Sequence, residues 1–395
     1  MIPISLLRIA RCAVILAVCA VSATSLCAQG LPREGLDIEH GLTIAPSGRP
    51  PEQRDLLEAM QALRIPSVSV AVIEGGRLAW ARAFGTGATA DTLYQAASLS
   101  KLVTAVAALR LVEQGRLALD RNVNDELADE RAAWRLPDSA LAHGHPVTLR
   151  GLLSMTAGIG VPGYIGYAPG QPLPSLAQIL DGVPPATSPP VRIEYTPGTR
   201  YAYSGGGYEI VQALIAAAAH RPFGEAMEEL VFRPLAMSDS LFLQPLPPTF
   251  ASKAAEGHDA NGAPLPGGWR VVPELAAGGL WSTPADLAKL LIAIADAYRG
   301  KATTFLSQSM ARAMVTRQGV GPYGLGGAVA GSGSDLVLMK RGQNVGYQSY
   351  MLIFPETGQG MVVMSGSDNG TTLATALIRR AAAAYRWPPL GELLD

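Results

Sequence analysis

Residues 94–115 read YQAASLSKLVTAVAALRLVEQG and predict a long apolar helix that ends at Gly115. Ser98 stands where this helix would begin, and Lys101 follows three positions later. Because an α-helix has about 3.6 residues per turn, the two side chains would project from the same face. A serine beside an amine at a helix N-terminus can be an activated nucleophile, but serine is also a common helix cap. The Ser-x-x-Lys pattern alone therefore leaves both interpretations of Ser98 open.

The composition is that of a globular chain without a strong electrostatic preference. The 395 residues are 48% hydrophobic and 16% charged, which is enough for a large core. The length favours two domains, or one domain with a large insertion. The formal net charge is −1 and no Lys/Arg-rich run occurs, so we expect no nucleic-acid partner and no attraction to an anionic membrane.

The N-terminus has the pattern of a targeting segment. Arg8 and Arg11 precede an apolar run at residues 12–21, and small residues follow up to Ala28. This order predicts a signal peptide over residues 1–28, cleaved near Ala28; a retained anchor is the alternative. All three cysteines of the chain lie in this segment: Cys12, Cys19 and Cys27. The mature chain would then have no disulfide, no thiol nucleophile and no stable membrane insertion, which fits a bacterial periplasmic or secreted protein.

The first part of the mature chain predicts an arm, a helix and a hairpin. Residues 29–48 are rich in Gly, Pro and polar groups and predict a flexible arm. Residues 50–63 carry apolar side chains at helical spacing. Two β-rich runs at residues 67–73 and 77–82 flank Gly75-Gly76, a pair typical of a tight hairpin.

The middle of the chain predicts helices and the last quarter predicts strands. Thr148 and Thr283 are placed as helix caps, whereas residues 162–197 are too rich in Pro and Gly to predict regular structure. The candidate strands near the C-terminus are residues 323–329, 335–340, 347–354 and 360–365, and an Ala-rich helix is predicted at 371–385.

The order of these elements predicts how the domains are arranged. Residues 49–120 and 296–395 would form one α/β domain from both chain ends, with an all-helical domain at residues 121–295 inserted between them. A functional site is expected in the cleft between two such lobes.

Two further groups of residues could supply the chemistry that a serine nucleophile needs. Tyr203 lies in a Gly-rich loop before a predicted helix, and Lys340-Arg341-Gly342 ends a predicted strand, followed by Gln343. A Tyr or Lys whose pKa is depressed by a nearby cation can accept the serine proton. A glycine on an edge strand lets a substrate approach closely, and backbone N–H groups there can bind an oxyanion. The alternatives are that Tyr203 is a core aromatic and Lys340 a solvated strand end.

With these residues in this order, the chain resembles the penicillin-recognising serine hydrolases, in their class C β-lactamase and esterase-like branch. Residues 98–101 match S-x-x-K, residues 203–205 match Y-x-N in the tyrosine only, and residues 340–342 match K-T-G. The resemblance extends from about Pro66 to Phe354. It implies the β-lactamase-like fold of the α/β (α+β) class, an antiparallel sheet flanked by helices with an inserted all-helical domain.

The resemblance also implies roles for the six candidate site residues. Ser98 would attack a carbonyl and form an acyl-enzyme, with Lys101 and Tyr203 sharing proton transfer. Backbone N–H groups of Ser98 and Gln343 would form the oxyanion hole beside Gly342, and Lys340 would steady Tyr203 or attract a substrate carboxylate. No metal or organic cofactor is expected, and His143 and His145 are interpreted as surface residues.

Two departures from the family pattern bear on the substrate, a small ester, amide or peptide. Gly205 stands where the family has an Asn that contacts a substrate amide, which favours esters or less polar amides. Arg341 replaces a small hydroxyl residue. A true β-lactamase or D,D-peptidase and a non-catalytic penicillin-binding-like sensor remain the alternatives to an esterase- or peptidase-like hydrolase.

Overall fold

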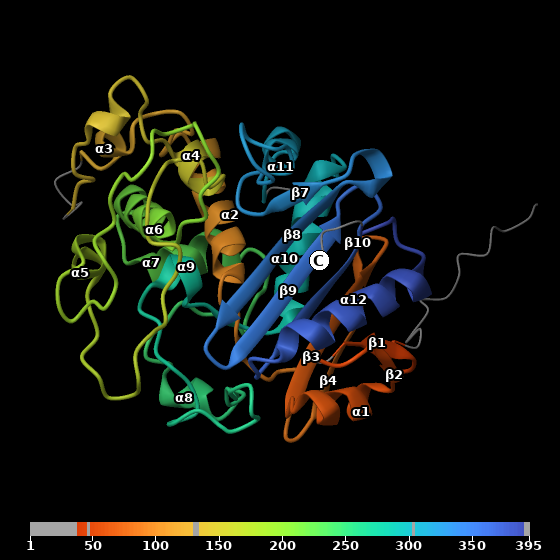
Figure 1. Cartoon of the computed structure of the whole chain (residues 1–395). Helices are drawn as coiled ribbons and strands as arrows, with labels where there is room; N and C mark the ends of the chain where they lie inside the picture. Colours follow the sequence, from red (N-terminus) through yellow and green to blue (C-terminus); the bar gives the residue numbers. More distant parts are fainter. Residues whose placement is uncertain (1–37, 46–47, 129–133, 302–304, 391–395) are drawn as a thin grey trace, which may run out of the picture. The chain divides into compact units, whose positions relative to one another are not determined.

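The fold is described from a computed structural model that covers residues 38–45, 48–128, 134–301 and 305–390. Its centre is a six-stranded antiparallel sheet (Figure 1). The strands are β3 (Ser67–Glu74), β4 (Arg77–Gly85), β7 (Ala328–Ala330), β8 (Val337–Asn344), β9 (Tyr347–Phe354) and β10 (Gln359–Ser365), in the order β4-β3-β10-β9-β8-β7. The predicted antiparallel sheet is confirmed, whereas the predicted signal peptide at residues 1–28 lies outside the described residues.

The predicted hairpin between β3 and β4 is confirmed. Gly75 and Gly76 have φ angles of 58° and 76°, the left-handed conformation that a two-residue turn requires at both positions. On its other side, β3 pairs with β10, so that Val70 lies opposite Val363. This pairing joins strands from the two ends of the described chain in one sheet.

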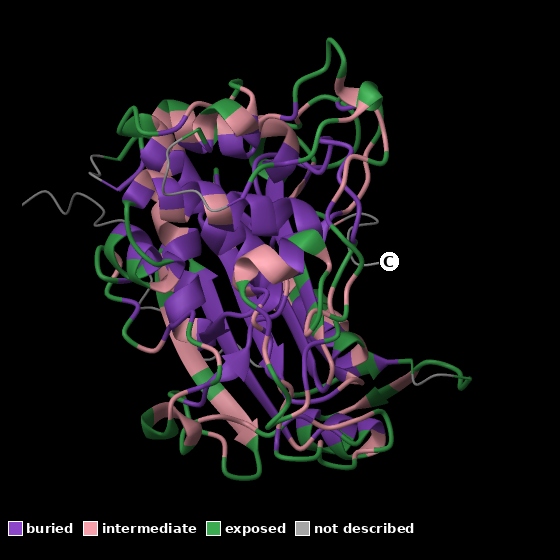
Figure 2. Ribbon diagram, turned by 90° about the vertical axis from the view of Figure 1, so that its left-hand side faces the viewer, coloured by how far each residue is buried: buried purple, intermediate pink, exposed green. Residues whose placement is uncertain are grey.

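Helices cover both faces of the sheet and create two apolar cores. Alternate residues of β3 divide between them, since Val70 and Val72 lie in one core and Ala71 and Ile73 in the other. The first core is closed by α1 (Leu56–Leu63) and α12 (Gly370–Tyr385), the second by α2 (Leu99–Glu113) and α10 (Pro284–Tyr298). In Figure 1, α12 lies in front of the sheet and α10 behind it. The central strands β3, β9 and β10 are buried along nearly their whole length, whereas no residue of the edge strand β4 is buried (Figure 2).

Helix α2 is the helix predicted to begin at Ser98 and end at Gly115, and it is enclosed by protein. Every residue from Leu99 to Leu109 is buried, as expected for a helix that is apolar all round. It packs against β8 and β9 on one side and against α6 (Gly205–Ala219) and α9 (Leu275–Gly278) on the other. In the described part of the chain, no helix combines the length and apolarity needed to cross a membrane.

Helices and loops occupy much of the region between residues 121 and 295. Besides the long helix α6, the helices here are short and include α3 (Val123–Glu126), α4 (Leu149–Leu153), α5 (Leu176–Asp181), α7 (Phe223–Met227), α8 (Pro248–Ala251) and α9. Thr148 accepts a hydrogen bond from the N–H of Gly151 and Thr283 accepts one from Asp286, so both predicted caps are confirmed. Helix α10 was predicted within the helical insertion, but it packs against β3, β4, β9 and β10 of the sheet.

Residues 29–48 were predicted to form a flexible arm, and this prediction was wrong for residues 42–44. They form β1 (Leu42–Ile44), which pairs with β2 (Glu52–Arg54), and Leu42 and Ile44 are fully buried beside α12. The helix predicted from residue 50 begins only at Leu56 for the same reason. The strand pairing and the burial of two apolar side chains outweigh a local composition that favours a loop.

Two further predictions need correction. The Pro-rich stretch 162–197 contains α5, because Ser175 and Gln178 form a capping box at its N-terminus. The strand predicted at 323–329 is confined to β7, since Gly326 has a φ of 113° and the preceding residues form a loop. Strand β8 begins later than predicted and continues to Asn344, so Lys340 lies in its middle and not at its end.

Candidate active site

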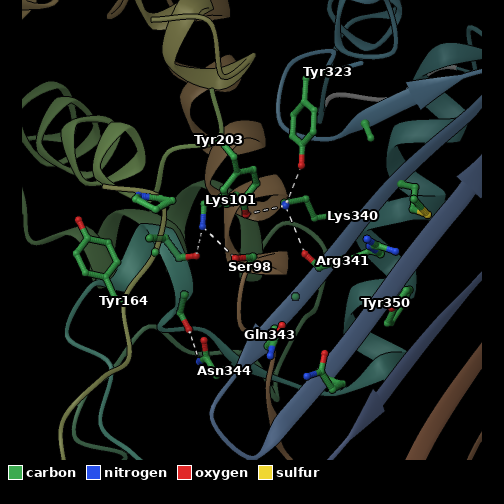
Figure 3. A pocket seen from close by; sticks show the side chains of 18 of the residues that line it. Ser98, Lys101, Tyr164, Tyr203, Tyr323, Lys340, Arg341, Gln343, Asn344 and Tyr350 are labelled. Carbon is green, nitrogen blue, oxygen red and sulfur yellow. Dashed lines mark hydrogen bonds between the residues drawn. The ribbon is translucent and has the colours of Figure 1, made fainter. Parts of the chain in front are cut away.

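A cavity of about 760 Å³ lies where α2, α9 and β8 meet the loops before α6 (Figure 3). All six residues singled out in the sequence line it: Ser98, Lys101, Tyr203, Lys340, Gly342 and Gln343. Strand β7 pairs only with residues 337–339 of β8. The rest of β8 therefore presents an edge without a strand partner to the cavity, next to Ser98.

Ser98 precedes the first turn of α2, but its side chain makes no capping hydrogen bond. Its Oγ instead accepts a hydrogen bond from Nζ of Lys101 at 3.1 Å. The interpretation of Ser98 as a plain helix cap is therefore wrong. The helical spacing places the amine beside the hydroxyl, as the sequence predicted.

The turn that carries Ser98 is held in an unusual conformation. Ala97 has a φ of 50°, a conformation that costs energy for a residue with a Cβ and is often found at functional sites. Its carbonyl accepts a 2.5 Å hydrogen bond from Ser100, whose Oγ in turn accepts the N–H of Leu280. These hydrogen bonds hold the turn around Ala97 in place, directly before Ser98.

Strand β8 passes so close to this turn that only glycine fits at position 342. A Cβ added to Gly342 would lie 2.5 Å from the carbonyl oxygen of Ala96 and 2.9 Å from the backbone nitrogen of Ser98. Gly342 thus brings the edge of β8, and Gln343 with it, next to the backbone of Ser98. This proximity is what two backbone donors would need to share one oxyanion.

Lys101 is almost fully buried, with 1% of its surface exposed. Its Nζ donates to Oγ of Ser98 and, at 2.6 Å, to the carbonyl oxygen of Ala277 in α9. Burial lowers the pKa of Lys101, although the neighbouring Tyr203 acts in the opposite direction. The amine is thereby fixed in place and is more ready to lose a proton than an exposed lysine.

Tyr203 is positioned by the first turn of α6. The next residue, Ser204, caps that helix by accepting the N–H of Gly207, and it donates to the carbonyl oxygen of Gly160. Burial by itself would raise the pKa of Tyr203, but the ammonium groups of Lys101 and Lys340 outweigh it and lower the pKa to about 7. The phenol lies in the cavity and is suited to accept a proton near neutral pH, unlike an ordinary core aromatic.

Lys340 is buried as well, with 3% exposure, so it is not a solvated strand end. Its Nζ donates to the hydroxyl oxygen of Tyr203 at 3.0 Å and to that of Tyr323 at 3.2 Å. The sequence analysis did not identify Tyr323 as a site residue and assigned it only to the predicted strand at 323–329. Arg341 also lines the cavity, from the face of β8 opposite to Lys340, where its guanidinium lies 5.8 Å from the ring centroid of Tyr350.

Two buried glutamates lie close to each other near the site, Glu209 beside Lys101 and Glu274 beside Glu209, and no sequence motif indicated either of them. Oε1 of Glu209 accepts the N–H of Ala277 at 3.0 Å, while Oε2 has no hydrogen-bond partner among the described residues. Burial raises the pKa of Glu209 well above its usual range and that of Glu274 to about 7. Among the described residues no three His, Cys, Asp or Glu side chains are grouped as a metal site would require, and His143 and His145 are exposed.

Comparisons with known proteins agree with this geometry. A family model described as Beta-lactamase matches residues 53–386. This chain belongs to the Beta-lactamase family. The family includes hydrolases of the esterase and peptidase type, so the chain is a serine hydrolase of the β-lactamase-related kind.

Relatives within the family are distant. The chain is 26% identical to penicillin-binding protein 4 of Amycolatopsis lactamdurans over 82% of this chain and 87% of that one. It is 29% identical to esterase EstB of Burkholderia gladioli over 53% of this chain and 57% of that one. The octameric penicillin-binding protein homologue of Pyrococcus abyssi superposes with a TM-score of 0.65 at 23% identity, over 85% of this chain and 77% of that one. This likeness shows the β-lactamase-like fold.

Proposed function

We propose that this chain is an exported serine hydrolase that forms an acyl-enzyme on Ser98 and cleaves an ester or amide bond, with esters preferred. One observation carries the proposal. The hydroxyl of Ser98 lies 3.1 Å from Nζ of Lys101, in the same cavity as a Tyr203 phenol whose pKa is about 7. A nucleophile and a base adapted to neutral pH are thus next to each other.

In the acylation step, Oγ of Ser98 attacks the substrate carbonyl carbon and its proton passes to the Tyr203 phenolate, or to Lys101 when this side chain is a neutral amine. The negative charge that develops on the carbonyl oxygen is stabilised by the backbone N–H groups of Ser98 and Gln343. When the bond to the leaving group breaks, the proton held by the base passes to the departing oxygen or nitrogen. Nζ of Lys340 donates a hydrogen bond to the hydroxyl oxygen of Tyr203 and would hold this side chain in place.

In the deacylation step a water molecule replaces the leaving group. The phenolate of Tyr203 takes a proton from this water, whose oxygen attacks the acyl carbon, and Ser98 recovers a proton as its ester bond breaks. The class C pattern favours Tyr203 as the base in this step, and Lys101 is the second candidate.

The preference for esters rests on position 205. Gly205 offers no side-chain donor to a substrate amide, and the esterase EstB is among the relatives of this chain. The alternative enzyme is a true β-lactamase or D,D-peptidase. It is supported by similarity to a penicillin-binding protein and to a D-alanyl-D-alanine-carboxypeptidase/endopeptidase. A non-catalytic sensor is the third candidate, but the close contacts among Ser98, Lys101 and Tyr203 argue for catalysis.

Export is part of the proposal because the first 28 residues have the order of a signal peptide. The enzyme would then act in the periplasm or outside the cell. Cell fractionation with an antibody, together with N-terminal sequencing of the mature form, tests this part. A mature form that still begins at Met1 and stays in the cytoplasm would refute it.

The catalytic proposal is tested with the purified protein comprising residues 29–395. It is treated with a fluorophosphonate probe and assayed with p-nitrophenyl esters and a chromogenic cephalosporin in parallel. We expect labelling and ester hydrolysis in the wild type and neither in Ser98→Ala. Equal labelling of the two proteins would exclude Ser98 as the nucleophile, and rapid cephalosporin turnover without esterase activity would favour the β-lactamase alternative.

A further inference from the structure

One wall of the active-site cavity is apolar, and it lies opposite the cationic side. In Figure 3, Tyr164 lies on the other side of Ser98 from Lys340 and Arg341. Pro162, Gly163, Val272 and Gly278 line the cavity together with the ring of Tyr164. The carbonyl oxygen of Gly278 is already occupied, because it accepts a hydrogen bond from Asn344. Apart from the side chain of Asn344 at its edge, this wall therefore has few groups left to bind a polar substituent.

The ring of Tyr164 occupies the direction in which a side chain at position 205 would project. A Cβ added to Gly205 would lie 3.0 Å from Cε2 of Tyr164, closer than ordinary van der Waals contact. The hydroxyl of Tyr164 points away from Ser98 and has no hydrogen-bond partner among the described residues (Figure 3). The substrate would thus meet the ring and not the hydroxyl.

The reacting carbonyl can be oriented from the groups around Ser98. Its oxygen would point to the backbone of Ser98 and Gln343, and its leaving group would point to Tyr203, which holds the proton that this group needs. The acyl substituent takes the remaining direction, along the wall that contains Tyr164.

We propose that Tyr164 is a specificity-determining residue that restricts the acyl group of the substrate to apolar groups without an amide. The inference rests on the proposed acyl transfer at Ser98. Burying an amide against the ring without a hydrogen-bond partner should lower kcat/KM roughly tenfold to hundredfold. An alkyl chain in the same place gains from leaving water.

The test compares two substrates that share one leaving group. p-Nitrophenyl butyrate carries a plain alkyl acyl group, and the p-nitrophenyl ester of N-acetylglycine carries an amide. The measured quantity is the ratio of their kcat/KM values. We expect the wild type to favour the butyrate by at least tenfold, and Tyr164→Ala to reduce this ratio by about tenfold by admitting water to the wall. Tyr164→Phe is the matched control: it keeps the ring and should keep the wild-type ratio.

Variants at position 205 provide an independent test of the proposal. Gly205→Asn alone should lower kcat/KM for both esters, because the new side chain collides with the ring. The double variant Tyr164→Ala/Gly205→Asn should relieve the collision and show the strongest relative activity on the amide-bearing ester. If Gly205→Asn changes kcat/KM by the same factor in the wild type and in Tyr164→Ala, the proposal is wrong.

Fluorophosphonate labelling of every variant shows whether Ser98 and its surroundings are intact. If labelling persists and Tyr164→Ala stays within twofold of the wild-type ratio, the inference is wrong while the proposed function stands. It is also wrong if Tyr164→Phe changes the ratio as much as Tyr164→Ala. If neither ester is hydrolysed in a Ser98-dependent way, the proposed function fails and the inference falls with it.

Discussion

Nζ of Lys340 lies 3.0 Å from the hydroxyl oxygen of Tyr203, although 137 residues separate the two in the chain. Lys340 comes from the middle of β8, and Tyr203 from the loop before α6. Nζ of Lys101 lies 5.2 Å from the centroid of the Tyr203 ring. Lys340 and Lys101 together thus surround this phenol with positive charge. The contact connects the sheet and the helical region at the point where proton transfer would occur.

Removal of the Tyr203 hydroxyl should mainly lower turnover. Tyr203→Phe keeps the ring but cannot accept or donate the proton, so we expect kcat for a p-nitrophenyl ester to fall by on the order of 10²–10⁴. Steady-state kinetics measure this, and the melting temperature serves as the control for folding. A variant within threefold of the wild-type kcat would show that Tyr203 is not the base.

Loss of the Lys340 charge should shift the pH profile to more alkaline values. Tyr203 acts as a base only when deprotonated, so the wild-type rate should fall as pH drops through the phenol pKa of about 7. Lys340→Met removes one of the two cations that lower this pKa, and the acidic limb of kcat/KM should move up by about one to three pH units. Lys340→Arg keeps the charge and should shift the limb less. An unmoved limb in Lys340→Met would mean that another group controls it.

A methyl group at position 342 should disturb the turn that carries Ser98. In Gly342→Ala the added Cβ would collide with the carbonyl oxygen of Ala96, and we expect a loss of about 1–3 kcal/mol in the free energy of unfolding together with slower fluorophosphonate labelling. Gly163→Ala is the control for stability, because a Cβ there meets no atom within 4 Å. Thermal melts of both proteins check the prediction, which fails if the two variants melt alike.

The buried carboxyl group of Glu274 should make stability depend on pH. Burial raises its pKa from 4.5 to about 7, so between these values the folded protein holds a proton that the unfolded chain releases. Stability should therefore fall as pH rises through this window, by up to about 1.4 kcal/mol per unit. Glu274→Gln cannot titrate and should show a flatter dependence between pH 5 and 7. Parallel slopes in chemical denaturation of the two proteins would contradict this.

Local sequence determined the features that depend on neighbours along the chain. The Ser98–Lys101 contact follows from the spacing of one helical turn, and the β3–β4 hairpin follows from the glycine pair at 75–76. The caps at Thr148 and Thr283 follow in the same way, because a side-chain oxygen meets an N–H three residues later. The order of the three motifs along the chain resembles that of a known family, and this resemblance predicted that Ser98, Tyr203 and Lys340 lie in one site.

Only the tertiary structure decided the contacts between distant segments. Strand β1 forms because β2 and α12 bury Leu42 and Ile44, which no local pattern indicates. Lys340 becomes a partner of both Tyr203 and Tyr323 because β8 extends to Asn344, and Glu209 reaches Ala277 because α6 packs on α9. The ring of Tyr164 fills the space beside Gly205 for the same reason. Hydrogen-bond geometry within a few residues is encoded locally, whereas burial, pKa values and the shape of a cavity depend on which surfaces meet when the chain folds.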